Sequence, residues 1–225
     1  MNSNTSLVSF QALLTSLVLL LFLPTLASAE WLSTVSRLLF SVTMLCCLYL
    51  AARDKKELLI GTIIFVPTMT TKWMLAPALP PETQLLCYCV LQIIFLCYVM
   101  RIVYQRLLSI RAVNREVISA TIALYLMSAI CLTLIYYAIL IFEPNAFGGK
   151  IILDSNDSHS ASKVFQELIY FSLVTQTSLG YGDLSPTLDS ARIIASFQAI
   201  LGQLYIAVIV GRLVGIAITT QQDKE

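Results

Sequence analysis

A nine-residue run from Thr175 to Asp183, Thr-Gln-Thr-Ser-Leu-Gly-Tyr-Gly-Asp, contains residue types that could bind a dehydrated cation through the backbone. Gly180 and Gly182 flank Tyr181, and two hydroxyl residues precede them. Glycine adopts positive φ at little steric cost, so a Gly-Tyr-Gly segment can turn successive carbonyl oxygens to the same side. Four such segments around an axis would form stacked carbonyl rings that replace the hydration shell of an ion. The run therefore predicts an ion-binding segment, provided that the rest of the chain builds a pore around it.

The run resembles the selectivity filter of the potassium-channel family, usually Thr-Val-Gly-Tyr-Gly-Asp, with Ser178 and Leu179 at the Thr and Val positions. The resemblance implies that K⁺ is bound by backbone carbonyls, those of Ser178, Leu179, Gly180 and Tyr181. It also implies that the Ser178 hydroxyl is the innermost ligand. The candidate ion-binding residues are Thr177, Ser178, Leu179, Gly180, Tyr181, Gly182 and Asp183.

The resemblance also assigns supporting roles to residues near the filter. Tyr170 and Phe171 stand where relatives pack aromatic side chains that hold the filter diameter, and the alternative is ordinary apolar packing. Asp183 in relatives bonds back to the pore helix. The carboxylate that some relatives carry behind the filter falls at Val174, so that brace is missing. We therefore expect a less rigid filter and a less sharp selection of potassium over sodium.

The composition is that of a membrane protein. Hydrophobic residues make up 58% of the chain, charged residues 12%, and the mean hydropathy is +0.82. A soluble domain carries about 25% charged residues, so half of the usual charge is missing. The net charge of +1 gives no reason to expect nucleic acid as a partner.

Six apolar stretches are predicted from hydropathy, at about residues 8–28, 34–52, 58–79, 84–106, 116–142 and 189–218. The segment 162–177 is too short to span a bilayer but suits a re-entrant half-helix that leads into the filter. We expect an all-α membrane protein with about six transmembrane helices and a re-entrant pore helix and filter loop between the last two. Residues 1–110 would form a four-helix membrane region, and residues 111–225 the pore domain with outer helix, pore helix, filter and inner helix.

Charge position predicts the orientation. Basic residues gather in the loops after the second and fourth stretches and in the tail, at Arg53, Lys55, Lys56, Arg106, Arg111, Arg115, Arg212 and Lys224. Acidic residues gather on the alternate side, at Glu30, Glu82, Glu143, Asp154, Asp157 and Asp189. By the positive-inside rule both termini are cytoplasmic, in a plasma or inner membrane. Residues 1–29 could instead be a cleaved signal peptide, since Leu-Ala-Ser-Ala precedes Glu30, although the first ten residues contain no Lys or Arg.

The last apolar stretch offers a hinge and a gate. Gly202 lies 20 residues after Gly182, the spacing at which relatives place a hinge glycine, and close helix packing is an equal alternative. Gln203, Ile206, Val210 and Val214 share one face at helical spacing, which the resemblance assigns to the cavity. Val210 and Val214 would then form an apolar constriction that gates by dewetting.

A voltage sensor and a thiol or metal site are both disfavoured. Arg101, Arg106, Arg111 and Arg115 drift around the fourth helix instead of recurring at every third position, and the positive-inside rule explains the last three. The six cysteines all lie in apolar segments, where free cysteine packs as a small hydrophobe, and His159 is the one histidine. No cofactor is expected, and what opens the pore is unknown.

Region 116–218 resembles the two-helix pore module of potassium channels, and the preceding spans resemble the membrane extension of six-span bacterial single-pore channels without a charged sensor. One filter per chain predicts a homotetramer in the bilayer that conducts K⁺ passively. The alternatives are a non-selective or sodium-passing cation channel, a carrier, and an auxiliary subunit without its own current. An enzyme would need convergent His, Asp or Cys at membrane depth, which the spans lack.

Overall fold

The apolar stretches form helices, because a helix satisfies every backbone hydrogen bond within one segment. The computed structural model describes residues 3–26, 41–46, 48, 55–73, 80–108, 115–148 and 158–222. Its elements are α1 (Ser3–Leu26), α3 (Lys55–Trp73), α4 (Pro81–Leu108), α5 (Arg115–Phe142), β1 (Phe147–Gly148), α6 (Ser158–Gln176), β2 (Ser185–Pro186), α7 (Asp189–Tyr205), the π-helical turn η1 (Ile206–Val210) and α8 (Gly211–Gln222). The expected all-α character is confirmed in these residues.

Three helices of the described residues are long and apolar enough to cross a membrane. They are Glu82–Leu108, Arg115–Phe142 and Asp189–Ile216, so the membrane class is confirmed. They coincide with the last three of the six predicted spans. The span 8–28 overlaps α1, whose apolar part is Phe10–Phe22, and 58–79 overlaps α3 as far as Trp73. The span 34–52 lies largely outside the described residues, so six spans stay a prediction.

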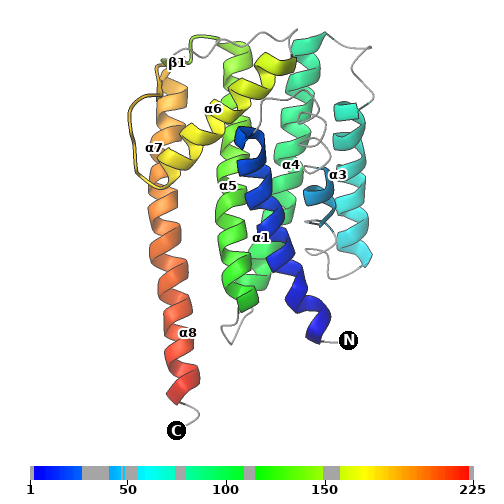
Figure 1. Cartoon of the computed structure of the whole chain (residues 1–225), viewed down its shortest axis with the longest axis vertical. Helices are drawn as coiled ribbons and strands as arrows, with labels where there is room; N and C mark the ends of the chain where they lie inside the picture. Colours follow the sequence, from blue (N-terminus) through cyan, green and yellow to red (C-terminus); the bar gives the residue numbers. More distant parts are fainter. Residues whose placement is uncertain are drawn as a thin grey trace.

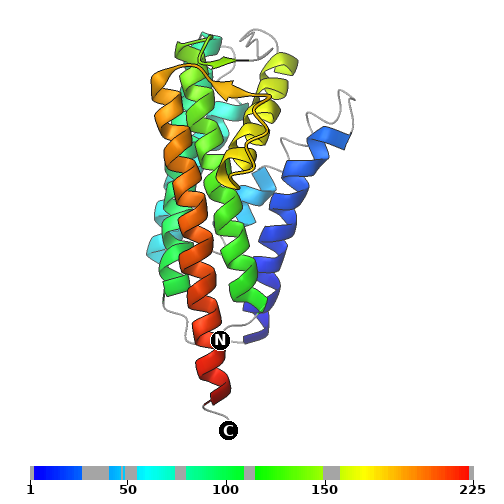
Figure 2. The same ribbon diagram turned by 90° about the vertical axis from the view of Figure 1, so that its left-hand side faces the viewer.

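Helix α5 is the centre of the bundle. It packs against α4, α1 and α6, and α7 also contacts it (Figure 1). Neighbours on several sides of α5 leave Met127, Leu134 and Tyr136 fully buried. Helices α7 and α8 continue one another through η1 as a single long rod (Figures 1 and 2). More than half of the apolar membrane-spanning segment of α5 is buried, against 22% of that of the rod. The rod is therefore largely exposed in the single chain.

The chain after α6 turns back to the end of the bundle from which α6 starts. In Figure 1, α6 descends part of the way from that end, and the loop that follows returns to the start of α7. The returning loop is fastened by an antiparallel pairing of β1 with β2, Phe147 opposite Pro186 and Gly148 opposite Ser185. The Thr187 amide also donates to the Ala146 carbonyl at 2.9 Å. The segment that contains the filter motif is therefore anchored on both sides, by α6 and by this bridge.

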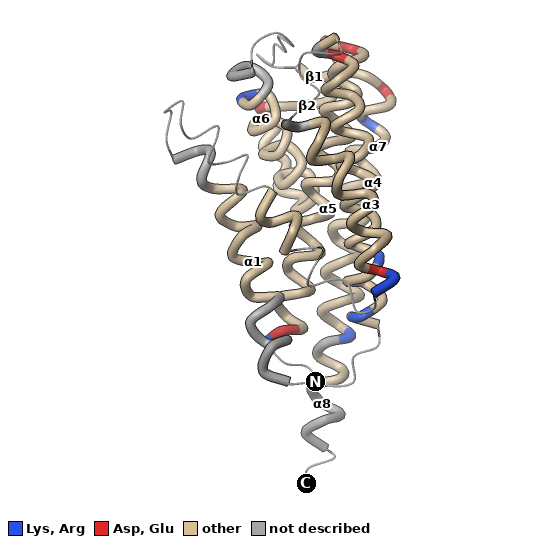
Figure 3. Tube along the Cα trace, turned by 90° about the vertical axis from the view of Figure 1, so that its right-hand side faces the viewer, with Lys and Arg blue, Asp and Glu red and all other residues tan. Residues whose placement is uncertain are grey.

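Charged residues lie toward the two ends of the bundle, with an uncharged band between them (Figure 3). The C-terminal end of α4 with Arg106 and the N-terminal end of α5 with Arg115 are at the same end as both chain termini (Figure 1). This is the arrangement that the charge pattern predicts, although which side of a membrane each end faces stays a prediction. Several residues used for that prediction lie outside the described residues, namely Glu30, Arg53, Arg111, Asp154, Asp157 and Lys224.

Candidate functional site

Helix α6 ends at Gln176, the second residue of the nine-residue motif, and the chain reverses direction there. The Ser178 amide donates to the Thr175 carbonyl at 3.0 Å, and the Leu179 amide donates to the Val174 carbonyl at 2.9 Å. This pair of bonds is the Schellman arrangement, which requires a left-handed residue at the position of Ser178. Ser178 has φ 57° and is the only non-glycine residue with positive φ in the described part of the chain. The hydrogen bonds of the helix end thus impose a conformation that serine alone does not favour.

Positive φ then recurs at every second residue of the motif. Gly180 has φ 57° and Gly182 has φ 80°, while Leu179 and Tyr181 between them have negative φ. In an ordinary strand successive carbonyls point to opposite sides, and alternation of left- and right-handed residues turns them toward the same side. Glycine at two of these positions makes the conformation inexpensive. The φ pattern is the one that a one-sided row of carbonyls requires, and ion binding by these residues stays a prediction.

The outer end of the motif is braced by two tyrosines and Asp183. The Tyr170 hydroxyl donates to Asp183 Oδ2 at 2.8 Å, and the Leu184 amide donates to Asp183 Oδ1 at 3.1 Å. The rings of Tyr170 and Tyr181 stack with centroids 6.5 Å apart and planes 8° from parallel. The hydrogen bond to Asp183 raises the pKa of Tyr170 to about 12, as expected when a phenol donates to a carboxylate. The structure thus contains the bond from Asp183 back to the preceding helix.

Replacing Tyr170 by phenylalanine removes this donor and keeps the stacked ring. For the potassium channel that the sequence resemblance predicts, we expect a several-fold fall in the K⁺/Na⁺ permeability ratio, because Asp183 loses the contact that holds this end of the motif. The measurement is the reversal potential in asymmetric K⁺ and Na⁺. Tyr98→Phe is the matched control, since its hydroxyl bonds to the Glu57 carbonyl at 2.8 Å, far along the chain from the motif. Equal reversal potentials for Tyr170→Phe and wild type would contradict the role of the brace.

The two other predicted supporting residues act in different ways. Phe171 is buried in a cluster of edge-to-face rings with Tyr136 and Phe147, at centroid distances of 5.2 and 5.3 Å. This cluster joins α6 to α5 and to β1. Val174 acts through its backbone, because its carbonyl accepts the amides of Leu179 at 2.9 Å and Gly180 at 3.4 Å. A carboxylate is missing at Val174, but the helix end still holds the motif by these main-chain bonds.

Gly202 lies in close contact with the end of α6. A Cβ atom added to Gly202 would meet the Gln176 carbonyl oxygen at 2.0 Å. Close helix packing, one of the two explanations for this glycine, therefore agrees with its surroundings. A hinge at Gly202 stays a prediction. The neighbouring Gln203 extends toward the motif, with Nε2 3.1 Å from Ser178 Oγ and 3.5 Å from the Thr177 carbonyl.

The rod formed by α7, η1 and α8 contains the π-helical turn between two side-chain contacts to other helices. Above it, the Tyr205 hydroxyl donates to the Thr121 carbonyl on α5 at 2.6 Å. Below it, Arg212 donates to the carbonyls of Leu107 and Leu108 at the end of α4, at 3.0 and 2.6 Å. The predicted gate residues Ile206, Val210 and Val214 are all exposed in the single chain. Because Ile206–Val210 form the π turn, the 3.6-residue spacing that placed them on one face with Gln203 does not continue unbroken.

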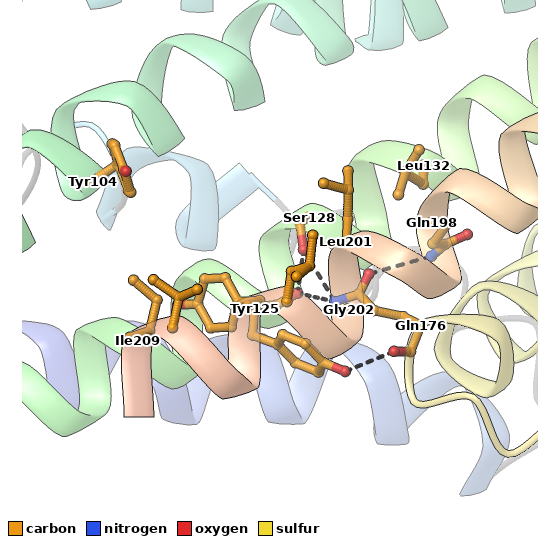
Figure 4. A pocket seen from close by; sticks show the side chains of 12 residues that line it. Tyr104, Tyr125, Ser128, Leu132, Gln176, Gln198, Leu201, Gly202 and Ile209 are labelled. Carbon is orange, nitrogen blue, oxygen red and sulfur yellow. Dashed lines mark hydrogen bonds between the residues drawn. The ribbon is translucent and has the colours of Figure 1, made fainter. Parts of the chain in front are cut away.

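Sequence reasoning missed a buried polar cluster behind the motif. It contains side chains from α5, α6 and α7, and several of them line a cavity of about 320 Å³ (Figure 4). Its members are Tyr125, Ser128, Tyr136, Ser172, Gln176 and Gln198. The signal that could have found it was glutamine within otherwise apolar helices, because buried amides in a membrane require partners.

Residues 124–219 match the model of a family described as ion channel. The match extends from the middle of α5 through α6, the motif and the inner rod to α8. Neither the comparison with curated proteins nor that with solved structures gave a match. The family match indicates an ion channel and favours a channel over an enzyme.

Proposed function

We propose that the chain is one subunit of a potassium-selective channel that carries K⁺ passively across a membrane as a homotetramer. The positive φ at Ser178, Gly180 and Gly182, with negative φ between them, carries the proposal, because such alternation allows successive carbonyls to turn to one side. In this proposal the carbonyls of Ser178, Leu179, Gly180 and Tyr181 replace the water around K⁺. The partially negative C-terminus of α6 points into the same region and favours a cation there. No cofactor takes part.

The exposure of the motif supports a ring of several copies. In the single chain Leu179 is 56% and Tyr181 67% exposed. Irregular backbone at membrane depth persists only where protein or a water-filled cavity surrounds it. The inner rod is similarly uncovered, with Ile193 71% and Val208 62% exposed. Four copies around an axis would cover both surfaces and close the carbonyl rings. Both termini would face the cytoplasm from a plasma or inner membrane.

The test is reconstitution of the purified chain in liposomes under asymmetric K⁺ and Na⁺. We expect a reversal potential close to the K⁺ equilibrium value, block by Ba²⁺, and a purified particle with the mass of four chains. A reversal potential near zero would indicate a non-selective channel instead. The missing carboxylate at Val174, which leaves the motif less rigid, would favour that outcome. Saturable flux without Ba²⁺ block would indicate a carrier. Correctly assembled protein without current would indicate an auxiliary subunit.

A further inference from the structure

Gln198 is a fully buried amide in the middle of α7. Its Oε1 accepts the Tyr136 hydroxyl of α5 at 2.7 Å. Its Nε2 lies 2.8 Å from Ser172 Oγ and 3.0 Å from the Ser172 carbonyl on α6. The amide thus has one defined orientation, because the oxygen faces a phenol donor and the nitrogen faces acceptors. It joins the inner rod to α5 and α6 at a single point.

Gln176 is the last residue of α6 and extends this chain of bonds to the residue before the candidate ion-binding residues 177–183. Its Oε1 accepts Gln198 Nε2 at 3.2 Å, and its Nε2 donates to the Tyr125 carbonyl at 2.8 Å and to Ser128 Oγ at 3.0 Å (Figure 4). Its main-chain carbonyl accepts the Tyr125 hydroxyl at 3.0 Å and packs against Gly202. Side chain and backbone of Gln176 are therefore both held, one residue before Thr177.

Buried amides are a costly means of packing helices. Burial of an amide without hydrogen-bond partners destabilises the folded protein. An apolar side chain of the same size fills the same volume without this cost. The gain from polar bonds between membrane helices is small on average. What a fully bonded amide adds is a fixed geometry, because its donors and acceptors fit one arrangement of the helices. The position of this cluster shows what is fixed, namely the height and rotation of the α6 end from which the motif starts.

We propose that Gln198 and Gln176 are positioning residues that set the inner end of the ion-binding motif and thereby its discrimination between K⁺ and Na⁺. The inference rests on the proposed function. The Tyr170–Asp183 bond holds the outer end of the motif, and the amide cluster holds the inner end. Motion at either end changes the carbonyl spacing that distinguishes two cations of different radius.

The experiment compares the reversal potentials of wild type and Gln198→Leu in the same liposomes, with tetramer content and thermal stability measured in parallel. We expect the K⁺/Na⁺ permeability ratio of the assembled variant to fall about tenfold, on the order of one net hydrogen bond. Gln92→Leu is the matched control. Gln92 is equally buried and bonds across helices, to Met44 Sδ at 3.2 Å, but on α4. It is expected to keep the wild-type ratio.

Tyr136→Phe tests the same cluster if Gln198→Leu fails to assemble. It removes the donor to Gln198 and keeps the ring against Phe171 and Phe147. The ratio is expected to fall in this variant also, at unchanged tetramer content. A wild-type permeability ratio in assembled Gln198→Leu or Tyr136→Phe would overturn this inference and leave the proposed function intact. An equal fall of the ratio in Gln92→Leu would do the same. A wild type without selectivity would overturn the proposed function and this inference together.

Discussion

In the proposed tetrameric potassium channel, replacement of Gly202 by alanine is expected to abolish both assembly and K⁺ flux. The added Cβ would lie 2.0 Å from the Gln176 carbonyl oxygen and 2.9 Å from its carbon. These are backbone atoms, and the Tyr125 hydroxyl holds the same carbonyl at 3.0 Å. The only relief is separation of α7 from the end of α6, and overpacking of this kind costs about 1–3 kcal/mol or more in each subunit.

The measurement is the mass of the detergent-purified particle together with its thermal unfolding. Gly211→Ala is the matched control, because it adds the same methyl group to the same rod where no atom of the same chain lies within 4 Å. Alanine has the higher helix propensity by about 1 kcal/mol, so this variant should assemble with equal or higher stability. An assembled, stable Gly202→Ala tetramer would show that α6 and α7 are not packed as described.

Replacement of Gly180 by alanine is expected to eliminate K⁺ flux from tetramers that still assemble. Here the added Cβ meets nothing within 4 Å, and the difficulty is the φ of +57°. A left-handed backbone conformation destabilises a residue with a side chain by roughly 1–2 kcal/mol, and in a tetramer this strain arises in each of the four motifs. Rotation of this residue to negative φ relieves the strain and turns a carbonyl away from the ring.

Flux of K⁺ from loaded liposomes measures this effect, with particle mass as the assembly check. Gly148→Ala is the control, since its Cβ would make only ordinary contacts, the nearest at 3.4 Å to Thr187, and no positive φ is needed. Flux should persist in the control. Wild-type flux through Gly180→Ala would remove the motif from the conduction pathway. The two glycine variants thus separate packing from backbone conformation, because only Gly202→Ala should lose the tetramer.

Features encoded by neighbouring residues were predictable from the sequence. Helix α6 was expected at 162–177 and is found at Ser158–Gln176, and glycine at 180 and 182 indicated the positive φ that both residues have. Positive φ at Ser178 was not predictable from residue type. It follows from the bonds to Thr175 and Val174 that end the helix. Local chemistry therefore predicted the motif but not how the preceding helix positions it.

Features that depend on distant partners were not predictable. Gln198 bonds to Tyr136 and Gln176, which are 62 and 22 residues away in the sequence. A single sequence shows that a glutamine is present but not which helices surround it. The π turn Ile206–Val210 consists of apolar residues that suit an ordinary α-helix, so nothing in their types indicates it. Tertiary contacts flank the turn, from Tyr205 to Thr121 on one side and from Arg212 to the end of α4 on the other.

Arg212 makes the end of one helix depend on the position of another. The last carbonyls of a helix have no partner within it, and here the guanidinium of α8 serves those of Leu107 and Leu108 on α4. Displacement of the lower rod therefore leaves the α4 terminus incomplete, and displacement of the α4 terminus leaves a cation unpaired. The coupling is reciprocal, so the free energy by which one position of α4 favours the matching position of the rod equals that by which the rod favours α4. The end of α4 and the lower part of the rod are thus coupled through the side chain of Arg212.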